Sequence, residues 1–186
     1  MYSIADLKKE VLITLDGAPY KVVDSQHVSL GRGGAVMRTK LKNLLNGSVH
    51  ERTFRPAEKI QPADVSRQPM QYLYRQDGEL VFMNQTSYEQ EPIAAETLGE
   101  SARYLSEGTI ATLLAFNGRV IGLEMPNTVY LTVTETEPGV RGDTATASLK
   151  PCTVETGVVV PVPLFINTGD VIKVDTRTGA YLERKK

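Results

Sequence analysis

Four basic side chains in one short segment have the types and spacing suited to binding a polyanion. The segment VSLGRGGAVMRTKLKN (28–43) holds Arg32 among three glycines, and a cation follows at every second position. In a β-strand, alternation would place Arg38, Lys40 and Lys42 on one face, about 6.6 Å apart. Phosphates along a nucleic-acid strand repeat at a similar distance, roughly 6–7 Å. These cations therefore predict contact with a nucleic-acid backbone, against the plainer alternative of a charged, solvated strand face.

The glycine loop before these cations predicts an exposed tip. Gly31, Gly33 and Gly34 leave no Cβ on either side of Arg32, which permits positive φ angles and a close approach to another surface. A guanidinium offers planar, multi-donor hydrogen bonding and stacks on flat rings. We therefore expect Arg32 to enter RNA or another crowded polar cavity. The alternative is a simple flexible hairpin turn.

Short strands and turns must position these residues. Segments 20–28 and 35–44 alternate or are rich in β-branched residues, and they predict a hairpin around the glycine loop. Met37 and Leu41 alternate with the cations and are expected in the core. Asn46-Gly47 predicts a two-residue turn into a third strand.

Similar signals recur along the rest of the chain. A second hairpin is expected around Asp77-Gly78. A third group of strands begins after residues 125–128 and includes a turn at Thr178-Gly179. Only residues 94–108 look helical: Leu98, Ala102 and Leu105 fall at i, i+4 and i+7, and Gly108 is placed to end the helix.

These signals predict an all-β fold of three small antiparallel barrels in series, because strands separated by frequent turns restart three times. We place the domains at 1–64, 65–127 and 128–186. Each is small enough to have a marginal core alone, and no Gly/Ser-rich linker is visible. We therefore expect packed domains rather than units on loose linkers.

The net charge of −1 is unevenly distributed over the 186 residues. Residues 1–64 carry +3, residues 65–127 carry −4 and residues 128–186 carry 0. Within 28–59, seven cations against two anions give a local +5. Coulomb steering toward a polyanion extends about 10 Å in physiological salt. An anionic partner is therefore expected to meet the first third of the chain.

Residue patterns for catalysis, metal binding or membrane insertion are missing from the sequence. The two histidines, His27 and His50, have no second histidine at metal-ligand spacing, and no nucleophile turn or phosphate loop occurs. The single cysteine, Cys152, cannot form an internal disulfide and is expected to be a small buried side chain in a reducing cytosol. The longest apolar run, 157–166, is too short to span a bilayer. We expect no enzymatic activity, metal, cofactor or membrane partner.

Four segments resemble the bacterial elongation factor P family, and the resemblance runs essentially end to end. KPCTVETGVVVPVPLFINTGD (150–170) matches the family signature most specifically. The others are FMNQTSYEQ (82–90), PGVRGDTA (138–145) and VIKVDTRTGAY (171–181). Because the matches spread over all three predicted domains, the chain is identified as a member of this family.

The resemblance implies an L-shaped protein similar in outline to a transfer RNA, with an SH3-like barrel followed by two OB-fold barrels. It implies a cytoplasmic, monomeric translation factor that binds both ribosomal subunits, ribosomal RNA and the peptidyl-tRNA, and not DNA. Such factors stimulate peptide-bond formation at consecutive prolines, which react slowly because proline has a fixed φ and a secondary amine. The ribosome performs the chemistry, and the factor contributes orientation.

The resemblance also implies roles for particular residues. Arg32 occupies the family's tip position, which reaches toward the peptidyl-transferase centre and steadies the CCA end of the peptidyl-tRNA. Many members carry a modified lysine there, and one branch carries a rhamnosylated arginine. Because Ser29-Leu30 replaces a common lysine-proline pair, we expect an unmodified Arg32, with rhamnosylation as the alternative.

Two further groups are implied to contact the ribosome through the third domain. Gly142, Asp143 and Thr144 match a loop that lies near the exit-site codon and the small subunit, and the alternative is an ordinary turn. Tyr181 and Arg184 match residues directed toward the small subunit and tRNA, and the alternative is a structural role in the last strand.

Two other functions remain open. One is that of the related YeiP-like paralogue, whose loop and carboxy-terminal patterns differ. The other is a stand-alone protein that binds single-stranded RNA through an OB fold. Such a protein would need aromatic stacking platforms, yet aromatic residues make up 6% of the chain and tryptophan is absent.

Overall fold

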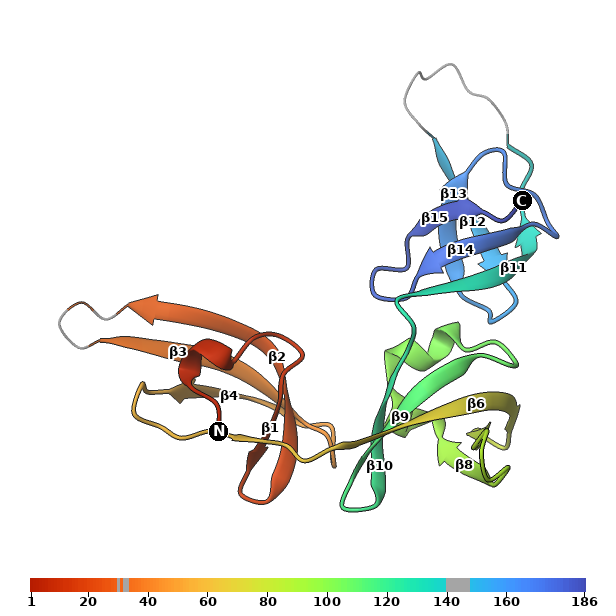
Figure 1. The fold of residues 1–186 in the computed structure, drawn as a ribbon. Coiled ribbons are helices and arrows are strands. Elements are labelled where there is room, and N and C mark those ends of the chain that lie inside the picture. The colour runs from red at the N-terminus through yellow and green to blue at the C-terminus, as the bar shows by residue number, and fades with distance from the viewer. Residues whose placement is uncertain (30, 32–33, 140–147) are drawn as a thin grey trace. The chain divides into compact units, whose positions relative to one another are not determined.

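The computed structural model describes residues 1–29, 31, 34–139 and 148–186. Fifteen strands in this part of the chain form three five-stranded sheets, joined by turns and short helical segments (Figure 1). The predicted all-β class is confirmed. No helix among these residues is long and apolar enough to cross a membrane.

Two compact units make up the chain, and each is described separately. The first unit consists of Met1–Ser66 and Ala115–Ile121, and the second consists of Arg67–Leu114 and Gly122–Lys186. The first sheet lies in the first unit and the third sheet in the second, while the strands of the second sheet belong to both. The domain boundaries proposed from the sequence stay a prediction.

The first sheet carries the glycine loop and has the strand order β4-β3-β2-β1-β5. After the 3₁₀ turn η1 (Ile4–Asp6), its strands are β1 (Leu12–Leu15), β2 (Ala18–Ser29), β3 (Ala35–Asn43), β4 (Val49–Phe54) and β5 (Gln61–Pro62). The long strands β2 and β3 form the predicted antiparallel hairpin. Met37 and Leu41 are buried with Ile13, Val22 and Phe54 in one core, as alternation requires.

The connection from β3 to β4 is longer than the predicted two-residue turn, because residues 44–48 all lie between the strands. The side-chain oxygen of the buried Asn43 accepts hydrogen bonds from the backbone N–H groups of Leu45, at 2.8 Å, and Asn46, at 3.3 Å. An asparagine side chain that binds its own following backbone mimics a turn. The turn therefore begins at Asn43, before the Asn46-Gly47 pair.

The second sheet has the strand order β10-β9-β6-β7-β8. Its strands are β6 (Ser66–Gln76), β7 (Glu79–Met83), β8 (Gln90–Ala94), β9 (Ile110–Phe116) and β10 (Arg119–Glu124). Asp77 and Gly78 connect β6 to β7 with φ angles of 51° and 83°, so the predicted tight turn is confirmed.

The predicted helix at 94–108 is wrong, because the segment forms two short pieces. Helix α1 spans Ala95–Leu98 and the 3₁₀ helix η3 spans Glu100–Tyr104. Gly99 between them has φ 73° and ψ −167°, a conformation that glycine adopts readily and a helix cannot contain. Of the three apolar residues at helical spacing, Leu98 and Leu105 are buried and Ala102 is half-buried.

The third sheet has the strand order β13-β12-β11-β14-β15. Its strands are β11 (Thr128–Thr136), β12 (Leu149–Val154), β13 (Val159–Pro163), β14 (Val171–Asp175) and β15 (Tyr181–Arg184). The core consists mainly of valine and isoleucine from these strands. Tyr104 of η3 also lies in this core, although β9 and β10 separate it along the chain from β11, the first strand of the sheet.

Candidate nucleic-acid interface

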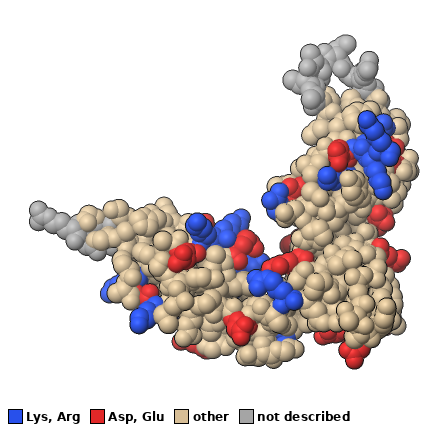
Figure 2. Space-filling model, in the orientation of Figure 1, with Lys and Arg blue, Asp and Glu red and all other residues tan. Residues whose placement is uncertain are grey.

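The cationic row, defined as Arg38, Lys40 and Lys42, lies on the outer face of β3. All three side chains are exposed, whereas the alternating residues from Met37 to Asn43 are buried. The predicted separation of charged and apolar faces is therefore confirmed. Figure 2 shows lysine and arginine atoms on the surface of the first unit with acidic atoms among them.

Lys40, at the centre of the row, lies between two carboxylates. Antiparallel pairing places Asp24 of β2 opposite it on one side and Glu51 of β4 on the other. Its Nζ atom is 4.0 Å from Glu51 Oε1. The β2–β3 register shifts after Val22, so that Asp24 rather than Val23 lies opposite Lys40. The positive charge at the centre of the row is thus partly offset.

The two ends of the row have different neighbours. Arg38 lies between two uncharged residues, Gln26 of β2 and Thr53 of β4. Lys42 lies opposite another cation, Lys21, whose ammonium pairs with a carboxylate in the segment before β1. Exposed ammonium and guanidinium groups without an opposing carboxylate are the ones that phosphates attract most strongly. The positive charge at the two end positions is therefore offset less directly than the charge of Lys40.

Gly31 and Gly34, the two described glycines of the loop, adopt the positive φ angles that the sequence predicted. Gly31 has φ 58° and Gly34 has φ 83°, values that residues with a Cβ adopt only with strain. No described heavy atom lies within 4 Å of a Cβ built on either glycine, so the positive φ angle, and not crowding, favours glycine there. Arg32 and Gly33 lie outside the described residues.

Residues implied to contact the small subunit are only partly described. Gly142, Asp143 and Thr144 lie outside the described residues. Tyr181 is half-buried and packs against the core of the third sheet. Arg184 is exposed, with Nη1 3.6 Å from Asp170 Oδ2 and its guanidinium 5.5 Å from the centre of the Phe165 ring. Arg184 therefore remains accessible, whereas Tyr181 also stabilises the fold.

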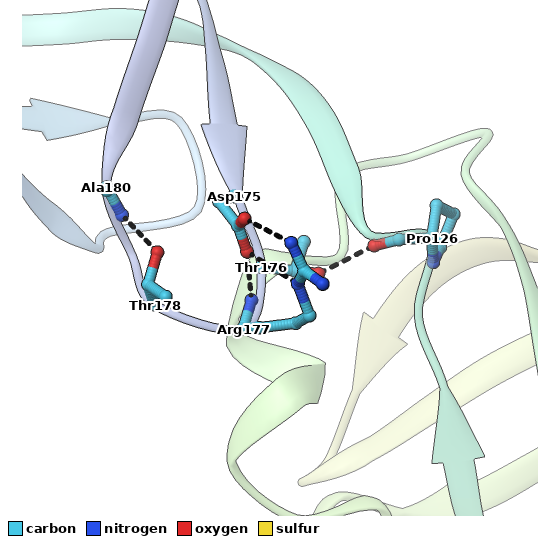
Figure 3. A network of polar contacts seen from close by, with 6 residues as sticks. All are labelled: Pro126, Asp175, Thr176, Arg177, Thr178 and Ala180. Atoms are coloured by element: carbon cyan, nitrogen blue, oxygen red, sulfur yellow. Dashed lines mark hydrogen bonds and ion pairs between the residues drawn. The ribbon is translucent and has the colours of Figure 1, made fainter.

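Polar contacts hold the turn from β14 to β15, which leads into the strand that carries Tyr181 and Arg184 (Figure 3). Asp175 receives hydrogen bonds at 2.8 Å from the backbone N–H of Arg177 and at 2.8 Å from its Nη2. Thr176 donates its hydroxyl to the Pro126 carbonyl at 2.6 Å, which ties the turn to the segment before β11. The side-chain hydrogen bond from Arg177, with that from its backbone, lowers the pKa of Asp175 to about 2.

Because the pKa of Asp175 is lower in the folded protein than in the unfolded chain, its ionisation stabilises the fold. This contribution is fully present above about pH 4 and is lost as the pH falls through about 2. We expect Asp175→Asn to be less stable than the parent at pH 6, and the difference to shrink toward pH 2. Urea unfolding followed by circular dichroism at several pH values measures this.

Asp64→Asn removes the same charge from the segment between β5 and β6 and serves as the control for overall charge. An equal stability difference between the parent and Asp175→Asn at pH 6 and pH 2 would contradict the role assigned to the Asp175–Arg177 turn.

Two residues that the sequence did not single out, Gly139 and Lys150, make close contacts at the third sheet. Lys150 is 6% exposed, and its Nζ donates a hydrogen bond to the Glu137 carbonyl at 2.6 Å. A Cβ built on Gly139 would overlap the Leu164 carbonyl oxygen. An isolated lysine in an otherwise apolar strand was the available signal for such a buried contact.

Cys152 is 1% exposed and lies in the core of the third sheet, as predicted for a small buried side chain. Burial raises the pKa of its thiol, which disfavours the reactive thiolate. Among the described residues, no group of three or more histidine, cysteine, aspartate or glutamate side chains could hold a metal ion.

Three five-stranded sheets, the first with an exposed cationic row, define the described part of the chain as a series of small β domains. Its fold is shared with a solved structure, "Eukaryotic translation initiation factor 5A from Methanococcus jannaschii", at 18% identity and a TM-score of 0.50. That similarity covers 67% of this chain and 90% of the other.

Family models identify all three domains. The model described as "Elongation factor P (EF-P) KOW-like domain" matches residues 3–60, "Elongation factor P (EF-P) OB domain" matches 65–123, and "Elongation factor P, C-terminal" matches 129–184. The chain therefore belongs to the elongation factor P family of translation factors.

Relatives named Elongation factor P are similar over their whole length. Those from Symbiobacterium thermophilum and Clostridium botulinum (strain Eklund 17B / Type B) are 50% and 51% identical, each over 99% of this chain and 100% of the relative. That from Synechococcus sp. (strain JA-2-3B'a(2-13)) is 50% identical over 100% of both chains.

Proposed function

We propose that this chain binds the ribosome beside the peptidyl-tRNA and stimulates peptide-bond formation where consecutive prolines stall translation. Arg32 steadies the CCA end of the peptidyl-tRNA, while Arg38, Lys40 and Lys42 hold RNA phosphates. The observation that carries the proposal is the exposed cationic row on the strand that directly follows the glycine tip. Membership of the elongation factor P family supports the ribosome as the partner.

The row and the tip have different tasks in this proposal. Phosphate contacts fix the position and orientation of a protein on RNA and carry little sequence information. Once the hairpin is held, the tip restricts the motion of the CCA end, which lowers the entropic part of the barrier to peptide transfer. Because the ribosome performs the chemistry, the chain does not act as an enzyme in this proposal. It acts as a monomer in the cytoplasm.

The third domain contributes a second anchor. Gly142, Asp143 and Thr144 approach the small subunit near the exit-site codon, and Tyr181 and Arg184 contact the small subunit and tRNA. The exposed guanidinium of Arg184, shared between Asp170 and the Phe165 ring, is available to exchange its carboxylate partner for a phosphate.

A reconstituted translation reaction tests the function directly. Synthesis through a Pro-Pro-Pro template is compared with and without the chain, and a template lacking consecutive prolines serves as the control. We expect acceleration on the first template alone. Equal rates on the Pro-Pro-Pro template with and without the chain would exclude the proposed activity.

The neighbours of the cationic row predict unequal contributions from its members. We expect the double variant Arg38→Ala/Lys42→Ala to weaken ribosome binding. The slope of log affinity against log salt concentration should become less steep by roughly 1.5, because two phosphate contacts are lost. We expect Lys40→Ala to have a smaller effect, because Asp24 and Glu51 already offset its charge. Binding of labelled protein to ribosomes across a salt series measures both.

Lys8→Ala/Lys9→Ala removes two exposed cations from the same unit, outside the sheet, and is the charge-matched control. If this control lowers affinity as much as the Arg38/Lys42 change, net charge and not the row governs binding.

The chemical state of Arg32 has its own measurement. We expect the intact mass of protein isolated from its native host to equal the sequence mass, which corresponds to an unmodified arginine. An added deoxyhexose mass would support the rhamnosylated alternative.

A further inference from the structure

The outer face of the third sheet carries an exposed aromatic ring with two lysines close to it. Tyr130 on β11 is 46% exposed and pairs with Lys173 on β14, which in turn pairs with Glu183 on β15. The Nζ atoms of Lys173 and Lys185 lie 5.8 Å and 5.5 Å from the centre of the Tyr130 ring. We call Tyr130, Lys173 and Lys185 the aromatic platform.

The aromatic platform is distinct from the pair Tyr181 and Arg184. Tyr181 and Arg184 lie opposite Val174 and Ile172, both of which are fully buried in the core. Because opposed residues share a face of a sheet, this pair belongs to the inner side. Tyr130, Lys173 and Glu183 occupy the opposite, solvent side.

Local contacts hold the ring in place before any ligand arrives. Lys173 Nζ donates a hydrogen bond to Glu183 Oε1 at 3.1 Å, and the Tyr130 hydroxyl lies 3.5 Å from the same oxygen. The hydrogen bond to Glu183 raises the pKa of Lys173, so this ammonium stays charged. A ring fixed in advance loses little conformational entropy when a flat ligand stacks on it.

The charge around the ring favours an anionic ligand. Residues 171–186 contain five lysine or arginine and two aspartate or glutamate residues, a net charge of +3. Figure 2 shows lysine and arginine atoms gathered around the chain end marked C in Figure 1, with few acidic atoms among them. An exposed aromatic ring with flanking cations is the combination that binds single-stranded nucleic acid, because the ring stacks on a base and the cations meet the phosphates.

We propose that the aromatic platform binds single-stranded RNA, with an unpaired base stacked on Tyr130 and a neighbouring phosphate held by Lys185, while Lys173 stays paired with Glu183 beside the ring. The exposed Lys185 side chain rotates away from the ring as the base enters, and its ammonium then meets a phosphate. The inference that this RNA belongs to the ribosome rests on the proposed function. The stacking contact itself does not depend on it. The contact adds an RNA-binding site on the third sheet to the cationic row on the first.

Fluorescence anisotropy with a short labelled oligoadenylate at low salt tests the contact on the full-length chain. We expect Tyr130→Ala to weaken binding by roughly 5- to 100-fold, the range measured for losing one stacked base. Tyr130→Phe keeps the ring without the hydroxyl and is expected to bind like the parent. Lys185→Ala is expected to make the slope of log affinity against log salt concentration less steep, by the amount that corresponds to about one phosphate contact.

Tyr88→Ala removes a tyrosine that is 71% exposed in the second sheet's β7–β8 connection, and it is expected to leave binding unchanged. Parent-like binding by Tyr130→Ala would overturn the proposal. Equal binding of duplex RNA, or equal competition by oligoglutamate, would also overturn it, because neither ligand offers an unpaired base. Running the same variants on the Pro-Pro-Pro template separates the two proposals, since RNA binding without rescue contradicts only the proposed function.

Discussion

Replacing Arg32 with alanine is expected to abolish stimulation of Pro-Pro-Pro synthesis while leaving ribosome binding nearly intact. The cationic row, which holds phosphates in the proposed function, is unchanged in this variant, so the hairpin still docks. What is lost is the contact proposed to orient the CCA end, and a misplacement of about 1 Å near reacting groups can cost roughly 100-fold in rate. Single-turnover peptide formation and ribosome binding, measured on the same preparation, separate the two effects.

Two variants sharpen this test. Arg55→Ala removes an exposed arginine from the same unit, outside the hairpin, and is expected to retain full stimulation. Arg32→Lys keeps the charge but loses the planar guanidinium, and it is expected to retain only part of the stimulation. Undiminished synthesis with Arg32→Ala would show that the tip does not orient the substrate.

Replacing Tyr104 with alanine is expected to destabilise the second unit by about 3–5 kcal/mol, the usual cost of deleting a buried aromatic side chain. Tyr104 is the largest fully buried side chain among the described residues and is 1% exposed. It belongs to η3, between strands of the second sheet, yet it packs in the core of the third sheet. Its loss removes a packing contact that joins the two sheets, so their unfolding is expected to become less cooperative. Urea unfolding followed by circular dichroism measures the midpoint and the slope.

Matched substitutions show whether packing is responsible. Tyr104→Phe removes only the hydroxyl, which accepts a hydrogen bond from Arg103 Nη2 at 3.2 Å, and is expected to cost about 1 kcal/mol. Tyr88→Ala, at an exposed position, is expected to change stability by less than about 0.5 kcal/mol. A loss with Tyr104→Ala no larger than with Tyr88→Ala would contradict a packing role for this ring.

The outward position of the cationic row was predictable from the sequence because it depends only on local geometry. Side chains alternate across any strand, so Arg38, Lys40 and Lys42 had to share a face once Met37 and Leu41 entered the core. The positive φ angles at Gly31 and Gly34 were predictable for the same reason, since glycine is the residue that adopts them without strain.

The helix predicted at 94–108 shows where local patterns fail. Apolar spacing identified Leu98 and Leu105 as buried, but it could not show that Gly99 leaves the helical region of backbone conformation. Glycine permits both conformations at similar cost. Packing of the surrounding residues, including Tyr104 in the third core, therefore decided between them.

The sequence by itself determined the all-β class, the hairpin with its glycine tip and the outward row of cations, because alternation and turn chemistry act between neighbours in the chain. Only the tertiary structure decided that Asp24 and Glu51 flank Lys40, because strand register depends on a shift within β2. It likewise decided that Tyr130 lies exposed beside Lys173 and Lys185. Those contacts join residues more than forty positions apart in the chain, and only long-range strand pairing brings them together.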